Sequence, residues 1–288
     1  MLIIMADLLS ISVGDLFLAA LMPGLVLAMF YVLYIGVASG INKELAPPLP
    51  PDALYVPPNE MPSLLLRSFF PPVFLIALIK GSILLGWATP SEAGAVGAFG
   101  ATVIAYFNGR LKRDMVTAVC QSSGLTISFI FFIIMSATCF AYVFRSLGGD
   151  DVIEELILHA GLDSWGLLFL IMGIVFLLGF FLDWVEITLI ILPVFAPIVA
   201  TLDFGAHVGN ENREMIYWFT VLIAINLQTS FLTPPFGYAL FYLKGIAPRS
   251  VALVSIYRGI IPFVILQLIA LALVIWLPAV ALWLPGLN

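Results

Sequence analysis

The chain has 288 residues, of which 62% are hydrophobic and 10% are charged, and its mean hydropathy is +1.16. Soluble domains carry about 25% charged residues, so this composition excludes a water-soluble protein and indicates an integral membrane protein with several spans. The two histidines and two cysteines exclude a multi-histidine or cysteine-rich metal site, and no P-loop motif for ATP occurs. The net charge of −6, without a basic patch, argues against nucleic-acid binding.

Long apolar runs predict membrane helices, because the strands of a membrane barrel alternate polar and apolar residues instead. The opening stretch, 1–7, is apolar at once and lacks the basic region and cleavage site of a signal peptide, so it is typical of the end of a helix. A proline-rich connector at 41–61 and a short acidic helix at 150–159 separate the membrane segments, and His159 and His207 are expected in solvated loops. In chain order the predicted segments are 15–39, 69–86, 90–107, 124–144, 165–182, 185–202, 215–243 and 251–276.

The basic residues orient these segments, because cytoplasmic loops of membrane proteins are enriched in lysine and arginine. Placing the basic turn at 110–113 in the cytoplasm also places the proline-rich connector there. The basic connection at 244–258 joins them on that side only if the two arms at 165–202 enter and leave on one face. We therefore predict a re-entrant hairpin with its tip at Asp183, whose non-helical backbone must be buried in protein or line a cavity.

Two stretches indicate an internal repeat. Ser-Val pairs at 12–13 and 250–251 precede long apolar segments that carry Pro23 and Pro262. In the orientation above, the two segments cross in opposite directions, as expected of the inverted repeats of secondary transporters. The second copy follows a proline-broken helix, whereas the equivalent element of the first copy would fall before Met1.

A polar cluster at a double proline is the strongest candidate site. Adjacent prolines remove two backbone donors and expose carbonyl groups, and a helix broken near the middle of the membrane offers oxygen ligands and half-helix ends to a cation such as sodium. The alternative is a plain proline kink whose polar side chains bond to their own backbone. The residues of this cluster are Asn226, Gln228, Thr229, Thr233, Pro234, Pro235 and Gly237.

The tip of the predicted hairpin is the second candidate, with Gly179, Asp183, Glu186 and Thr188. Carboxylates deep in a membrane cost about 2.5–3.5 kcal/mol each on insertion scales, so they usually face a cavity or a partner. Alternatively, the tip lies at an interface where water solvates both acids, or Glu186 pairs with a basic residue.

Thr89, Pro90 and Glu92 have the spacing of a helix start. Thr89 is placed as N-cap, Pro90 as the first helical residue and Glu92 as the acid that completes a capping box. We assign this stretch a structural role. No nucleophile–base pair and no metal-ligand set is visible in the chain, so the sequence predicts a protein that is not an enzyme.

Taken in order, these motifs resemble a known family. The segment 86–93 reads Gly-x-x-Thr-Pro-Ser-Glu-Ala, 179–197 reads Gly-x-x-x-Asp with later prolines, and 226–237 reads Asn-Leu-Gln-Thr-Ser-Phe-Leu-Thr-Pro-Pro-Phe-Gly. Together with the stretch at 12–24 they are similar to the large membrane subunit of tripartite ATP-independent periplasmic (TRAP) transporters, the DctM-like permeases. The resemblance covers essentially the whole chain.

The resemblance implies a permease subunit of a sodium-coupled secondary transporter that imports an organic acid, a carboxylate such as a dicarboxylate, across the bacterial inner membrane. Sodium is the implied coupling ion, and no other cofactor is implied. The implied partners are a small four-helix membrane subunit, a periplasmic substrate-binding protein and the lipid bilayer. The Asp183 tip and the polar stretch at 229–237 would form a sodium site and one wall of the substrate cavity in a domain that moves like an elevator.

The predicted fold is all-α: a polytopic helical membrane protein with a re-entrant helical hairpin and a broken helix, half of an inverted-repeat secondary transporter. The predicted parts are the last helix of a truncated first repeat (1–39), a proline-rich cytoplasmic loop (40–66), connecting and scaffold helices (67–149) and a second repeat (150–288) with its hairpin (164–202), broken helix (215–243) and final span (251–283).

The first repeat of the family has its own hairpin and a Pro-Pro-Ser break, which would lie upstream of Met1. We therefore expect the C-terminal part of a larger unit, which a mis-assigned start, a gene fragment or a split permease would each explain. Two rival hypotheses are a truncated or non-transporting membrane assembly subunit, and another ion-coupled anion permease of the same architecture.

Overall fold

The structure, a computed structural model, describes residues 1–42, 57, 60–149, 152, 155, 159, 161–199, 202–208, 212–233, 240, 243–244 and 252–287. These residues form helices, and no strand occurs among them. The chain divides into two compact units, residues 1–34 with 130–288 and residues 35–129. Two helices, α2 (Val13–Ile41) and α7 (Arg113–Ser146), run from one unit into the other.

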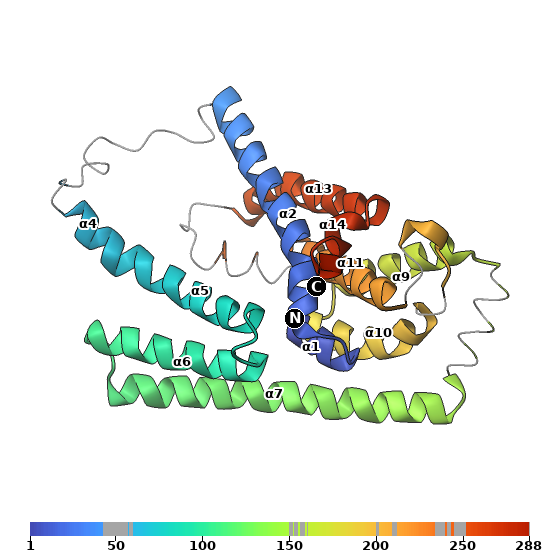
Figure 1. The fold of residues 1–288 in the computed structure, drawn as a ribbon, viewed down its shortest axis with the longest axis horizontal. Helices are drawn as coiled ribbons and strands as arrows, with labels where there is room; N and C mark the ends of the chain where they lie inside the picture. The colour runs from blue at the N-terminus through green and yellow to red at the C-terminus, as the bar shows by residue number, and fades with distance from the viewer. Residues whose placement is uncertain are drawn as a thin grey trace. The chain divides into compact units, whose positions relative to one another are not determined.

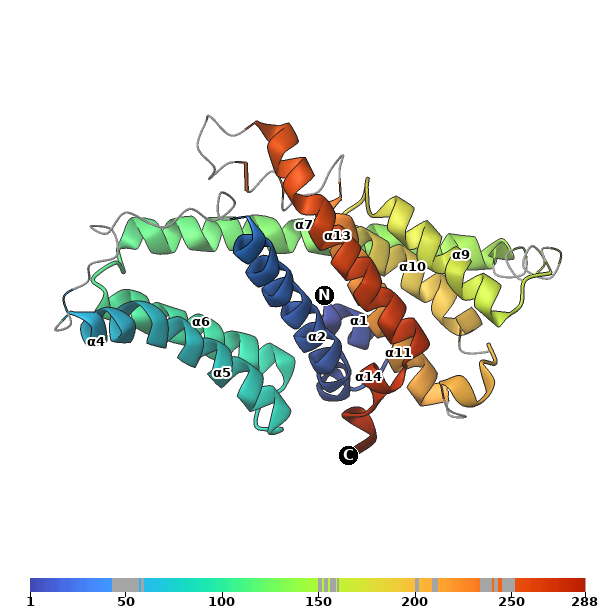
Figure 2. The ribbon, with the colours of Figure 1, turned by 90° about the horizontal axis from the view of Figure 1, so that it is seen from above.

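The unit of residues 1–34 and 130–288 is organised around α11 (Asn212–Leu232). In the apolar part of α11, 78% of the residues are buried, compared with 22% in α2 and 28% in α13. Figures 1 and 2 show α9, α10 and α13 gathered around this helix, with which each makes contact. The other helices of this unit are α1 (Leu2–Leu8), α9 (Ser164–Leu178), α10 (Trp184–Val199), the 3₁₀ turns η2 (Gly205–His207) and η3 (Pro285–Leu287), α13 (Leu253–Trp276) and α14 (Ala279–Leu282).

The end of α13 is held by two ring nitrogens. The indole N–H of Trp218 donates to the carbonyl of Val274, and Nε2 of His207 lies 2.8 Å from the carbonyl oxygen of Ile275. The last carbonyls of a helix have no partner within it, so these contacts satisfy two of them. Both rings also pack against Trp165, with centroids 5.0 Å (His207) and 6.4 Å (Trp218) away. The expectation that His207 is solvated was therefore wrong.

The unit of residues 35–129 contains a helical hairpin, drawn in Figure 1 as α5 and α6. Its first arm is continuous from Met61 to Leu84 through α4 (Met61–Leu64), a π-helical turn η1 (Leu65–Phe69) and α5 (Phe70–Leu84). The second arm is α6 (Pro90–Phe107), whose Gly97 and Gly100 face Ile79 and Leu75 of α5. Small residues let membrane helices approach closely, so this glycine ridge explains why the two arms pack together.

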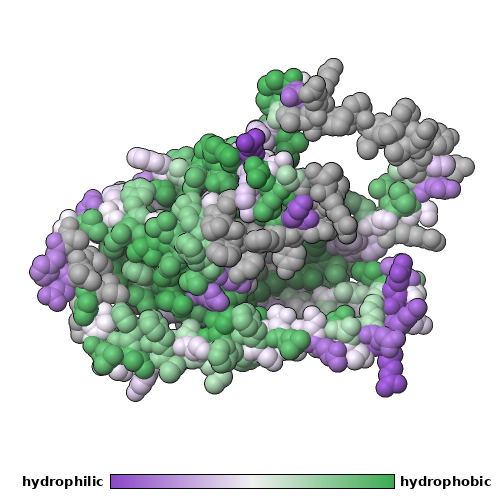
Figure 3. Space-filling view, turned by 180° about the vertical axis from the view of Figure 1, so that it is seen from behind, coloured by the Kyte–Doolittle hydropathy of each residue, from purple (hydrophilic) through white to green (hydrophobic). Residues whose placement is uncertain are grey.

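The exposed apolar side chains and the lengths of the helices indicate that this protein is surrounded by lipid. Trp87, Leu125 and Phe107 are 75–81% exposed, and Figure 3 shows hydrophobic side chains over most of the described surface on the face viewed. Soluble monomers rarely expose large continuous apolar patches. Four helical stretches in the described part are long and apolar enough to cross a membrane: Val13–Ile41, Arg113–Phe144, Arg213–Leu232 and Leu253–Trp276. The prediction of an all-α, polytopic helical membrane protein is confirmed.

Candidate functional site

The predicted hairpin consists of two short helices joined by the turn at 179–183. Asp163 begins α9 by accepting a hydrogen bond from the amide of Gly166 (2.9 Å), as an N-cap residue does. With 15 and 16 residues, α9 and α10 are about 22 and 24 Å long, less than the ~30 Å hydrocarbon core of a bilayer. Helices of this length suit a segment that dips into the membrane and returns.

The two acids of the tip hold the start of α10. The amide of Trp184 donates to Oδ1 of Asp183 (2.8 Å), and the amide of Asp183 donates to Oε2 of Glu186 (3.3 Å). The second contact is the return half of a capping box, in which the acid three residues after the cap accepts from the backbone of the cap residue. Both side chains are half-buried, so local backbone amides compensate part of the cost of placing these carboxylates here.

A polar seam joins the hairpin to the central helix. Nδ2 of Asn226, which is 1% exposed, donates to the carbonyl of Met172 in α9 (2.7 Å). One turn further along α11, the hydroxyl of Ser230 lies 3.2 Å from the carbonyl oxygen of Asn226 in the same helix and 3.5 Å from that of Phe176 in α9. Gly179 closes the seam, because a Cβ atom at that position would collide with the side chain of Ser230. The absence of a side chain at Gly179 thus sets how closely α9 approaches α11.

The threonines of the site differ in how their hydroxyls are used. Thr229 donates to the carbonyl of Ile225 (3.0 Å) and Thr233 to that of Thr229 (2.8 Å), so both bond to their own helix. Thr188 in α10 is fully buried, and its hydroxyl has no hydrogen-bond partner among the described residues. Buried polar groups are nearly always paired, so such a group calls for an explanation.

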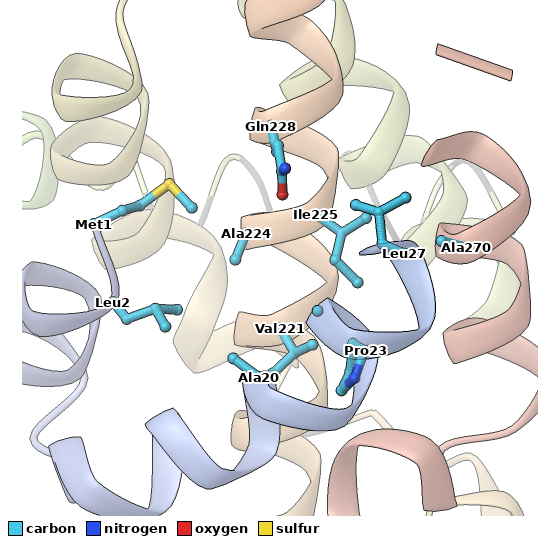
Figure 4. A pocket seen from close by; sticks show the side chains of 11 residues that line it. Met1, Leu2, Ala20, Pro23, Leu27, Val221, Ala224, Ile225, Gln228 and Ala270 are labelled. Carbon is cyan, nitrogen blue, oxygen red and sulfur yellow. The ribbon is translucent and has the colours of Figure 1, made fainter. Parts of the chain in front are cut away.

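Gln228 is the exposed exception in the buried run from Tyr217 to Ser230. Its carboxamide projects toward a pocket between α1, α2, α11 and α13, shown in Figure 4. The structure therefore separates the predicted cluster into two groups: Asn226, Thr229 and Ser230 lie inside the helix packing, whereas Gln228 faces open space. Ser230 belongs to the polar stretch at 229–237 that the resemblance implies for the sodium site.

The predicted helix break remains a prediction. The helix α11 ends at Leu232 and the described chain continues to Thr233. Pro234, Pro235 and Gly237 lie outside the residues that the structure describes.

The capping box at the start of α6 is present. The amide of Glu92 donates to the hydroxyl oxygen of Thr89 (3.4 Å), and Oε2 of Glu92 accepts from the backbone amide (2.7 Å) and the hydroxyl (2.9 Å) of Thr89. Pro90 occupies the first helical position, where its missing N–H costs nothing. This local hydrogen-bond network explains the presence of Thr89, Pro90 and Glu92 at these positions, and the explanation requires no ligand.

An ionic cluster at the start of α2 and α11 was not predicted. The guanidinium of Arg213 forms an ion pair with Asp15, and its carbon atom lies 5.7 Å from the ring centroid of Tyr217. The Tyr217 hydroxyl accepts from the amide of Ser12 (3.0 Å) and donates to Asp15 (3.4 Å). These residues are about 200 positions apart, so no local pattern indicates the contact, which fixes α2 to α11.

Fold and site together define a polytopic helical membrane protein with a polar seam inside its helix packing. The chain matches the family described as the DctM component of the tripartite ATP-independent periplasmic transporter over residues 1–280, and it belongs to that family. The resemblance read from the motifs is thereby confirmed. The members of this family are transporter permease subunits, so the prediction that the chain is not an enzyme is confirmed as well.

The relatives carry names for different solutes. The chain is 29% identical to the C4-dicarboxylate TRAP transporter large permease protein DctM of Pseudomonas aeruginosa and 25% identical to the ectoine permease TeaC of Halomonas elongata. Each of these alignments covers 96% of this chain and 60% of the relative. The 2,3-diketo-L-gulonate permease YiaN of Escherichia coli is 29% identical over 72% of this chain and 46% of its own length. The chain thus spans about 60% of the length of the first two relatives.

Proposed function

We propose that the chain is a permease subunit of a sodium-coupled, binding-protein-dependent secondary transporter that imports an organic acid. In this proposal it works in the bacterial inner membrane with a small four-helix membrane subunit and a periplasmic substrate-binding protein. The single observation that carries the proposal is the family match over residues 1–280. The names of two relatives, for a C4-dicarboxylate and for 2,3-diketo-L-gulonate, support a carboxylate as the transported group.

The hairpin of α9 and α10 is the proposed coupling element. Its short helices, its turn at 179–183 and its close approach to α11 at Gly179 support a unit that moves together with the central helix. Transporter sites of this kind lie where non-helical backbone and half-helix ends meet near the middle of the membrane. Asp183 and Glu186 keep the turn compact by binding its amides.

The proposed sodium site is the region around the hairpin tip and the end of α11. A small cavity of about 10 Å³ lies here, lined by Gly179, Trp184 and Ser230 among others, and it is comparable to the space of one water molecule. Sodium is the transported co-substrate in this proposal, and hard cations prefer oxygen ligands. Asp183 precedes the lining residue Trp184 and Thr188 follows the lining residue Ile187. We include the Asp183 carboxylate and the Thr188 hydroxyl, which has no hydrogen-bond partner among the described residues, as further oxygen ligands of the proposed site. Thr233, the last described residue of this stretch, completes the proposed region.

Uptake into proteoliposomes tests the proposal. The chain is reconstituted with its small membrane subunit and its binding protein, and uptake of a radiolabelled organic acid is followed with and without an inward sodium gradient. We expect uptake that depends on the gradient, and we expect Thr188→Val to raise the sodium concentration for half-maximal uptake by about 10-fold, the effect of losing roughly 1.4 kcal/mol from one ligand.

Thr102→Val is the matched control, because the hydroxyl of Thr102 bonds to the carbonyl of Ala98 on the exposed surface of α6. It should leave the sodium dependence as it is in the unmodified protein. If Thr188→Val and the double variant Asp183→Ala with Thr233→Ala both retain the normal sodium dependence, the assignment of the site is wrong. If no organic acid enters with the gradient, the transport proposal itself is wrong.

A further inference from the structure

The turn between α6 and α7 concentrates positive charge. Arg110, Lys112 and Arg113 lie within four consecutive residues, and all three side chains are exposed. Figure 1 shows this turn at the end of the hairpin where α4 begins, and the described acids at that end are Glu60 before α4 and Asp114 in the first turn of α7. Neither acid forms an ion pair with the three cations, and no other described residue does so. All three positive charges are therefore available to a partner.

Local hydrogen bonds fix the shape of this turn. The amide of Arg110 donates to the carbonyl of Ala105 (2.9 Å), as in the Schellman motif that ends many helices. The amide of Gly109 donates to the carbonyl of Tyr106 (2.9 Å), and Gly109 has φ +65°, a left-handed conformation that glycine adopts without strain. Arg113 then begins α7. The three cations are thus held on one short segment between two helices.

Exposed aromatic side chains indicate that this turn lies at a surface of the membrane. Tyr106 and Phe107 are exposed at the end of α6, and Trp87 is exposed just before its start. Tryptophan and tyrosine are enriched where the hydrocarbon core meets the lipid headgroups. The 18 residues of α6 extend over about 27 Å, close to the ~30 Å thickness of the hydrocarbon core. The basic turn directly beyond Phe107 is therefore expected at the depth of the headgroups.

We propose that this turn binds the headgroups of anionic phospholipids such as phosphatidylglycerol. Guanidinium and ammonium groups donate charge-assisted hydrogen bonds to phosphate oxygens, and an arginine can do so through two parallel N–H groups. Phosphatidylcholine has its own cation next to the phosphate, so it gains less from the same three side chains. The lipid site is separate from the proposed sodium site, and its occupation requires neither sodium nor a transported acid.

Native mass spectrometry of the purified chain in an uncharged detergent tests the inference. The chain is titrated with phosphatidylglycerol and, separately, with phosphatidylcholine that carries the same acyl chains. Each lysine or arginine near an anionic lipid surface contributes about fivefold in affinity, so three of them should favour phosphatidylglycerol by roughly 100-fold. Arg110→Gln with Arg113→Gln should weaken the binding of phosphatidylglycerol by about 25-fold. The binding of phosphatidylcholine should change little.

Two matched variants serve as controls. Arg110→Lys with Arg113→Lys keeps both positive charges and should retain phosphatidylglycerol within about threefold of the unmodified chain, the difference being the paired N–H groups of arginine. Lys80→Gln with Arg258→Gln also removes two exposed cations, but from α5 and α13. This variant has the same net charge as the double arginine-to-glutamine variant, and it should bind phosphatidylglycerol as the unmodified chain does.

Four results would overturn the inference. The two lipids may bind the unmodified chain equally, or the arginine-to-glutamine variant may retain the full affinity for phosphatidylglycerol. The variant of Lys80 and Arg258 may lose as much affinity as the arginine variant, in which case binding follows the overall charge and not this turn. An excess of inorganic phosphate may displace phosphatidylglycerol when chloride at the same ionic strength does not, in which case the turn binds a free anion instead of a lipid.

Discussion

Replacing Gly179 with alanine adds one methyl group at the point where the hairpin meets the central helix. The new Cβ atom would collide with the side chain of Ser230 and would lie 3.2 Å from the carbonyl oxygen of Val175. The helix α11 is packed on several sides, and α9 contacts both α10 and α11, so the extra volume must be accommodated by shifting one helix. Overpacking of this kind costs about 1–3 kcal/mol. We expect Gly179→Ala to destabilise the protein by that amount.

Gly173→Ala provides a control with the same chemistry on the same helix. A Cβ atom at Gly173 would meet nothing within 4 Å, so alanine there should stabilise α9 by roughly 0.5–1 kcal/mol through its higher helix propensity. The two substitutions are thus expected to have opposite signs. Ser230→Gly makes room for the methyl group and should restore part of the stability that Gly179→Ala loses.

Thermal unfolding of the purified protein in detergent measures these differences. A loss of 2 kcal/mol corresponds to a decrease in Tm of about 4–8 °C for a chain of this size class. The close packing of α9 on α11 is refuted if Gly179→Ala and Gly173→Ala change Tm equally and in the same direction, or if Ser230→Gly gives no recovery in the double variant.

Three further predictions concern the parts of the structure outside the hairpin. Thr89→Ala removes the N-cap of α6 and should cost about 1 kcal/mol in thermal unfolding, whereas Thr89→Ser should cost less than half of that; equal losses would contradict the capping role. Gly100→Leu should separate α6 from α5 and speed hydrogen exchange of the α5 amides, while Gly94→Leu, where a Cβ atom meets nothing within 4 Å, should not; the packing is wrong if both variants exchange alike. A double-mutant cycle of Asp15→Asn and Arg213→Gln should give a coupling energy of at most about 1 kcal/mol that decreases with salt concentration, because the Arg213 side chain is 64% exposed. A larger coupling energy that does not change with salt concentration would contradict a surface ion pair.

Helices whose ends carry local signals could be predicted from the sequence. The segment predicted at 90–107 coincides with α6, because Thr89, Pro90 and Glu92 mark its start. The final span predicted at 251–276 corresponds to α13, Leu253–Trp276. The same reasoning missed the partial capping box of Asp183 and Glu186, although their spacing is that of Thr89 and Glu92. Because carboxylates are costly in a membrane, these two residues favour a ligand-binding interpretation. In the structure, both carboxylates accept hydrogen bonds from backbone amides.

Burial and long-range contacts could not be predicted, because hydropathy alone does not tell which apolar helix is surrounded by the others. The sequence of α11 is less hydrophobic than that of α2 or α13, yet α11 is the most buried of the three. The contact of His207 with the end of α13 and the pocket beneath Gln228 each require segments that only the folded chain brings together. A periodic pattern within one helix carries no information about such partners.

The transport proposal depends most on whether α9 and α10 enter and leave the membrane on one side. Sidedness of labelling measures this directly. Single cysteines replace Leu162 before α9, Asp203 after α10 and Arg110 between α6 and α7, in a chain whose Cys120 and Cys139 are changed to serine. A membrane-impermeant thiol reagent should label the first two from the same side of the membrane and the third from the other side. Labelling of positions 162 and 203 from opposite sides would contradict the re-entrant hairpin and the coupling mechanism built on it.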